Sequence, residues 1–135
     1  MAIRKGWVYD PPKPAIPAPL KAKVTRLAEE LIAERKPLLI VPPPPYWTFN
    51  TLVDLHGRWR GRFYYFIATY GNPNNGADAP TLECGVARLT YIGNERFDLV
   101  YRDVSGPTER WRPLYDNLPL DMALATVREE VLEAG

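Results

Sequence analysis

The spacing of apolar residues near the N-terminus predicts a helix. Apolar residues recur there every three or four positions, which is the spacing of one helix face. They are Leu20, Val24, Leu27 and Leu31. We expect this helix over residues 19–36, because Pro19 suits the first helical turn. Pro37 should end it, since the residue before a proline is disfavoured in the α region.

From Trp47 onward the period shortens to two, which indicates β-strands. One strand is expected over residues 47–55, with Leu52 as the exception to its alternation. A second is expected over about 62–70. It is apolar or aromatic on both faces, as is typical of a central strand that is covered on both sides.

Two further strands, over residues 82–92 and 96–102, are separated by a turn signal. A three-residue loop over residues 93–95 keeps one face of this hairpin apolar, whereas a two-residue loop sets apolar residues against charges. We therefore predict the first register. Its pairs are Tyr91 with Phe97, Leu89 with Leu99, and Ala87 with Tyr101.

The remaining pattern completes an α+β fold. A short edge strand is expected over residues 111–115, because Pro113 cannot donate to a ladder, and Pro119 should open a second helix. The prediction is an antiparallel β-meander of four to five strands flanked by an N-terminal and a C-terminal helix. A proline-rich N-terminal arm (1–18) precedes a single α+β domain (19–135). The sheet face expected to pack on the helices holds Phe49, Val53, Leu55, Leu89, Phe97, Leu99 and Tyr101.

Composition limits the class of protein. The chain has 135 residues and a net charge of +1, so overall charge does not indicate a nucleic-acid binder. Residues 46–115 contain eight arginines and no lysine, and arginine stacks on rings and forks onto oxyanions. The lone Cys84 excludes an intrachain disulfide and a multi-cysteine zinc site. Without a signal peptide or an apolar span, we expect a cytoplasmic protein with no membrane contact.

Arginines and aromatic residues alternate in the segment that begins at Arg58. If the strand runs unbroken, Arg58, Arg60 and Arg62 share one face and can follow phosphates while Tyr64 or Phe66 stacks a base. The alternative is a hairpin bend whose arginines are solvated. The predicted binding residues are Arg58, Trp59, Arg60, Arg62, Tyr64 and Phe66, with Asn74 and Asn75 of the loop at 71–80.

Catalytic chemistry has weaker support in the sequence. His56 and Cys84 would suffice for a thiolate nucleophile and its base, but a cysteine in an apolar strand is typical of core packing. Magnesium would need clustered acids. The candidates are Asp54, Glu83, Asp98 and Asp103. No catalytic residue, metal or cofactor is predicted.

These patterns favour a small non-catalytic binding or accessory protein. Its partner is expected to be a protein or a single-stranded nucleic acid, engaged through the aromatic and arginine strand. A hydrolytic enzyme of unrecognised type is the alternative. The arm, with prolines at 11, 14 and 17, is a candidate contact for a protein partner or a homodimer, filling the sheet face beside Tyr64 and Phe66.

Overall fold

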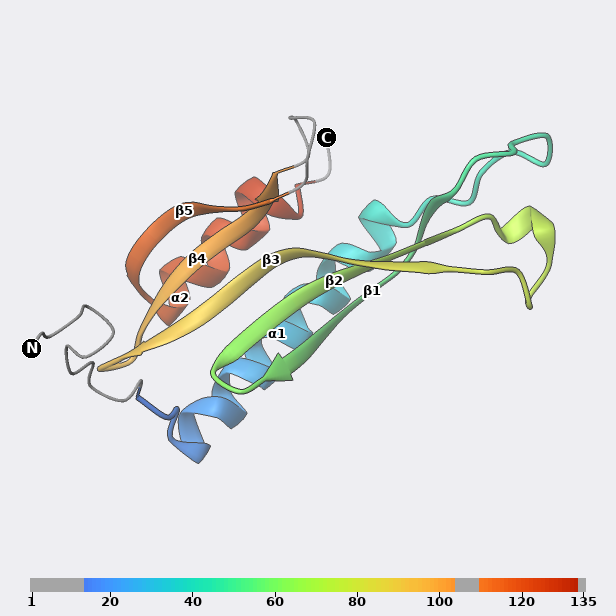
Figure 1. Cartoon of the computed structure of the whole chain (residues 1–135). Coiled ribbons are helices and arrows are strands. Elements are labelled where there is room, and N and C mark those ends of the chain that lie inside the picture. The colour runs from blue at the N-terminus through green and yellow to red at the C-terminus, as the bar shows by residue number, and fades with distance from the viewer. Residues whose placement is uncertain (1–13, 104–109, 134–135) are drawn as a thin grey trace, which may run out of the picture.

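Five antiparallel strands form one sheet in chain order, as the computed structural model of residues 14–103 and 110–133 shows (Figure 1). The five-stranded meander confirms the predicted sheet. The strands are β1 (Thr51–Arg60), β2 (Phe63–Gly71), β3 (Leu82–Gly93), β4 (Arg96–Asp103) and β5 (Arg110–Pro119).

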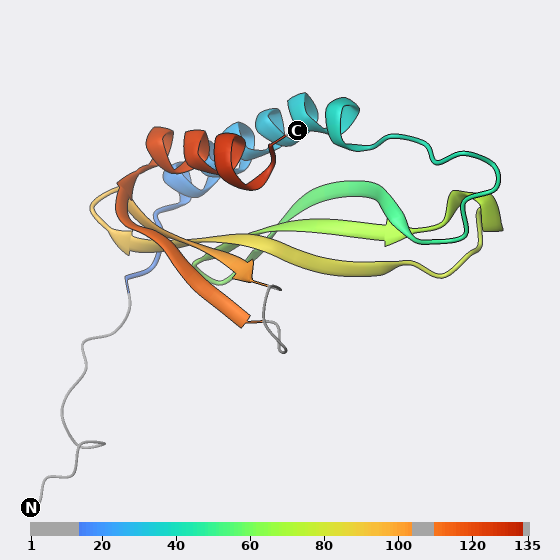
Figure 2. The same cartoon turned by 90° about the horizontal axis from the view of Figure 1, so that it is seen from above.

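Both helical segments lie on one side of this sheet (Figure 2). The N-terminal helix α1 (Ala18–Leu39) packs mainly on β1. The C-terminal helix α2 (Leu120–Thr126) continues into a π-helical turn, η3 (Val127–Val131), and these contact β3, β4 and β5. The predicted flanking helices are confirmed. None of the described segments covers the other side, which we call the open face.

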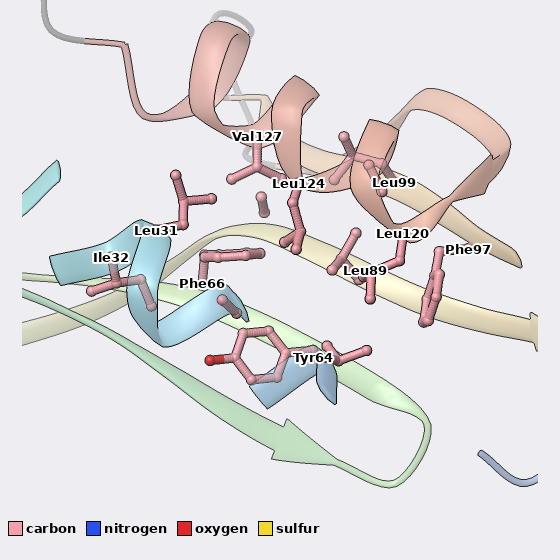
Figure 3. Packing of buried hydrophobic residues seen from close by; sticks show 14 of the residues in the cluster. Leu31, Ile32, Tyr64, Phe66, Leu89, Phe97, Leu99, Leu120, Leu124 and Val127 are labelled. Atoms are coloured by element: carbon pink, nitrogen blue, oxygen red, sulfur yellow. The ribbon is translucent and has the colours of Figure 1, made fainter. Parts of the chain in front are cut away.

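The core lies between the helices and the sheet, and it includes the side of β2 that carries Tyr64 and Phe66 (Figure 3). Tyr64 is 2% exposed and Phe66 is fully buried. Tyr64 pairs with Leu89, so the two residues face the same way. The helices therefore fill the space beside Tyr64 and Phe66 in which the N-terminal arm was expected, and residues 1–13 of that arm lie outside the described residues.

Most of the predicted core face is confirmed, with one clear error. Leu55, Leu89, Phe97 and Leu99 are buried, whereas Phe49 is 67% exposed. Phe49 precedes β1, which begins at Thr51 rather than at residue 47. The remaining two predicted members are only half-buried. They are Val53 and Tyr101.

A β-bulge explains the exception in the first strand. The register against β2 shifts between Leu52 and Asp54, so Val53 is the extra residue. The bulge reverses the alternation, and Leu52 and Leu55 both pack on the core. Leu52, which breaks the alternation in the sequence, was thus the signal of the bulge.

The predicted end of α1 at Pro37 is wrong. The helix continues to Leu39 with Pro37 inside its last turn. A proline removes its own N–H and its ring crowds the carbonyl four residues earlier, but the Ile40 N–H still donates to the Lys36 carbonyl at 2.9 Å. This bond closes the last turn in spite of the proline.

The β3–β4 hairpin has the predicted register, with Leu89 opposite Leu99 and Tyr91 opposite Phe97. Its turn differs, because Gly93 pairs with Arg96 and leaves a two-residue loop. Both loop residues, Asn94 and Glu95, have positive φ, of 53° and 56°. A register shift between Tyr91 and Gly93 reconciles this short loop with the apolar pairing.

Candidate functional site

The segment rich in arginine is an unbroken strand that turns only at its end. β1 pairs with β2 as far as Arg60, so Arg58 and Arg60 lie on the same, open face. Arg62 follows in the turn, where its Nη1 donates to the Tyr91 carbonyl at 2.8 Å. Two of the three arginines thus share a face, and the third holds the hairpin end to β3.

Trp59 points to the opposite side and anchors α1. Its Nε1 donates to the Thr25 hydroxyl at 2.7 Å, and the ammonium of Lys21 lies 5.2 Å from the centre of the ring. Tyr64 and Phe66 share this side of the sheet and are buried. These three predicted binding residues therefore hold helix and sheet together, and none of them lines the open face with its side chain.

The two asparagines of the predicted site lie at the far end of the sheet, in the turn η2 (Pro73–Asn75). The Asn74 amide donates to the carbonyls of Pro44 and Trp47 at 2.9 and 3.1 Å. Asn75 is exposed. Asn74 thus ties the proline-rich connector between α1 and β1 (residues 40–50) to the β2–β3 loop, which lies away from the end of β1 that carries the arginines (Figure 1).

The open face contains a guanidinium enclosed by aromatic rings. The Cζ of Arg88 lies 4.8 Å from the ring centre of Phe63, 5.2 Å from that of Trp111 and 5.9 Å from that of Tyr65. Its Nε is buried without a hydrogen-bond acceptor, and no carboxylate of the described residues pairs with it. We call Arg88 and these three rings the Arg88 cage. Cation–π attraction holds the guanidinium there.

Trp111 closes the Arg88 cage from the far edge of the sheet. It comes from β5, yet its indole reaches across β4 and β3 to contact the Tyr65 ring of β2, with ring centres 6.0 Å apart. Gly85 makes room for it, since a Cβ at that position would stand 3.3 Å from the indole. A side chain at position 85 would therefore crowd the indole of Trp111.

A groove of about 530 Å³ runs along the open face beside the Arg88 cage. Its walls include Arg58 and Arg60 from β1, Tyr65 from β2 and Trp111 from β5. Glu83 is the acid among its described lining residues, and its Oε1 lies 3.3 Å from the Nη2 of Arg58. Both members of this ion pair are about half exposed, so it is weak. The groove is therefore basic and aromatic.

The candidate catalytic groups are not brought together. His56 is on the open face, where its Nε2 lies 3.4 Å from Glu83, whereas Cys84 pairs with the buried Ala68 and faces the helices. The sheet therefore separates thiol and imidazole. The four acids have different partners, and no group of three potential metal ligands occurs within residues 14–103 and 110–133.

The sequence did not point to Arg88 or Trp111. The cage joins β2, β3 and β5, so it depends on the curvature of the whole sheet. One signal was available in the predicted register: Arg88 is a lone cation flanked by the core residues Ala87 and Leu89, and so must project from the opposite face. That signal would have placed a guanidinium at the middle of the open face.

The protein is of the α+β class, with helices on one side of its sheet and a basic, aromatic groove on the other. The chain belongs to the family described as "Domain of unknown function (DUF3024)", whose family model matches residues 16–133. No curated protein and no solved structure matches the chain. In the described part of the chain, no helix is long and apolar enough to cross a membrane.

Proposed function

We propose that this protein is a non-catalytic binding module that holds an anionic partner in the groove on the open face of its sheet. The observation that carries this proposal is the Arg88 cage. Its guanidinium has ring contacts but no described carboxylate partner.

The unsatisfied donor of Arg88 favours a ligand oxygen. A buried donor without an acceptor costs about 1–3 kcal/mol, and the Nε of Arg88 is such a donor among the described residues. A carboxylate or phosphate oxygen beside the cage would give the guanidinium a charge-assisted hydrogen bond that the described residues do not supply. The aromatic walls lower the local dielectric and strengthen the contact.

Two exposed arginines extend the basic surface beyond the cage. Arg58 and Arg60 lie two residues apart on the open face, and Arg60 has no ion-pair partner in the part of the chain that is described. Glu83 neutralises only part of this charge. A ligand with several negative groups would therefore bind more tightly than a single anion.

Binding of a labelled polyanion at low salt tests this proposal. We expect poly-glutamate or an oligonucleotide to bind. Arg88→Gln should lower the affinity for the tighter-binding probe at least about tenfold, as loss of a charged hydrogen bond implies. Arg26→Gln is the matched control. Arg26 is an exposed arginine of α1, paired with Glu30 and away from the groove.

Two further measurements keep this test decisive. Melting temperatures of the variants show whether Arg88→Gln still folds, and Arg58→Gln removes a groove charge at an exposed position. Equal affinities of Arg58→Gln and Arg26→Gln for the probe would contradict the proposal. Failure of both probes to bind at low salt would also contradict it.

A further inference from the structure

We infer that the anionic partner is a single-stranded nucleic acid, bound with its backbone along β1 and a base against Trp111. This inference rests on the proposed function and names its ligand. The groove combines three features that such a ligand needs: a row of arginines, an accessible aromatic ring and a concave shape.

The row of arginines follows one strand. Arg58 and Arg60 are two residues apart in β1, so their Cα atoms are about 7 Å apart along the strand. Both side chains are exposed on the open face. Guanidiniums spaced in this way can fork onto successive phosphates of one strand, and the backbone would then run parallel to β1.

The aromatic residues distinguish a nucleic acid from an acidic peptide. An acidic peptide would pair with the arginines and gain little from the rings. Bases stack on aromatic side chains and on guanidinium planes. Tyr65 and Trp111 line the groove and are half-buried, and the guanidinium of Arg88 lies 5.9 and 5.2 Å from the centres of their rings.

The shape of the groove excludes a duplex. Trp111 reaches over the sheet from its far edge, so the binding surface is concave, and its volume of about 530 Å³ suits one or two nucleotides. Proteins that read a duplex insert a protruding helix or ribbon into the DNA groove. The open face has no such element in the described ranges.

The experiment compares three labelled probes on the intact protein: a short oligothymidylate, a duplex of the same length and a poly-glutamate of the same charge. We expect the single strand to bind at least about fivefold more tightly than either of the others, which is the effect of stacking one base. With Arg58, Arg60 and Arg88 on phosphates, log affinity should fall against log salt with a slope of about −2.

Two variants separate charge from stacking. Removing both exposed arginines, by Arg58→Gln with Arg60→Gln, should reduce the slope to about −0.7. Trp111→Phe should abolish the quenching of tryptophan fluorescence that accompanies binding of the single strand, because it removes the indole on which a base would stack. Trp47→Phe is the control, since Trp47 lies against the β2–β3 loop, where its carbonyl accepts from Asn74, and does not line the groove.

The outcomes for the ligand and for the proposed function are distinct. If poly-glutamate or the duplex binds more tightly than oligothymidylate, the ligand is not a single-stranded nucleic acid. The proposed function as an anion-binding groove would still stand. Equal binding of all three probes would also overturn the single-strand assignment. Loss of binding to every probe at low salt would overturn the proposed function itself.

Discussion

The phenol of Tyr64 lies so close over Gly57 that a Cβ at residue 57 would stand 1.8 Å from its Oη. Gly57 is in β1, on the side of the sheet that faces the helices. Its missing side chain makes the space that the ring occupies beneath α1. Tyr64 then contacts Trp59 and Phe66 edge to face, with ring centres 5.2 and 5.3 Å apart.

Gly57→Ala should destabilise the protein. Replacing a strand glycine would ordinarily stabilise by roughly 0.5–1 kcal/mol, but overpacking costs about 1–3 kcal/mol, and here the new atom overlaps a buried ring. We expect a net loss of about 2 kcal/mol in urea unfolding. In a Tyr64→Leu background the same substitution should cost little. An equal cost in both backgrounds would contradict the steric account.

Tyr64 should also make stability depend on alkaline pH. Burial raises its pKa to about 12 from 10.0, and Glu29 adds to the shift. The folded pKa is above the unfolded one, so this contribution is complete below pH 10.0 and is lost as the pH rises to about 12. Unfolding midpoints of the natural chain should fall more over that window than those of Tyr64→Phe. If the unfolding midpoints of the two proteins fall equally with pH, the ionisation of Tyr64 does not contribute to the loss of stability.

The bond between Trp59 and Thr25 should contribute measurably to holding α1 on the sheet. Thr25→Ala removes the acceptor and leaves the indole N–H half-buried, so we expect a loss of about 1–2 kcal/mol in urea unfolding. Thr25→Ser keeps the hydroxyl and is the matched control. If serine and alanine cost the same, the methyl group rather than the hydrogen bond is responsible.

Asn74 should fix the proline-rich connector. Its amide bonds the Pro44 and Trp47 carbonyls, so Asn74→Ala should speed limited proteolysis between residues 40 and 50. Asn75→Ala is the control, because no bond of the Asn75 side chain occurs in the described structure. Similar cleavage rates for the two variants would contradict this role.

Local patterning was enough to predict the fold, and side-chain alternation was not enough to predict the site. Pairing Leu89 with Leu99 required only a period of two and one turn. The bulge at Val53 was missed although Leu52 broke the alternation, and the helical turn past Pro37 was missed because the Ile40 N–H still bonds the Lys36 carbonyl there.

The prediction of the binding residues was wrong for Tyr64 and Phe66 because of the composition of β2. Both faces of β2 are aromatic, so the sequence could not say which one the helices cover. The helices take Tyr64 and Phe66, and Tyr65 is left on the open face. The predicted hairpin register places Leu89 on the core face. It would have identified the covered face of β2 only if the pairing of Tyr64 with Leu89 had also been known. The two arginines of β1 were found because they belong to one strand.

The open face as binding surface is tested most directly by following the side-chain N–H signals of Arg88 and Trp111 by NMR while a short oligothymidylate is added at low salt. We expect both signals to shift saturably, together with backbone amides around Arg58 and Arg60, and the indole signal of Trp59 to stay in place beneath α1. Shifts confined to the helices, with Arg88 and Trp111 unchanged, would contradict the account.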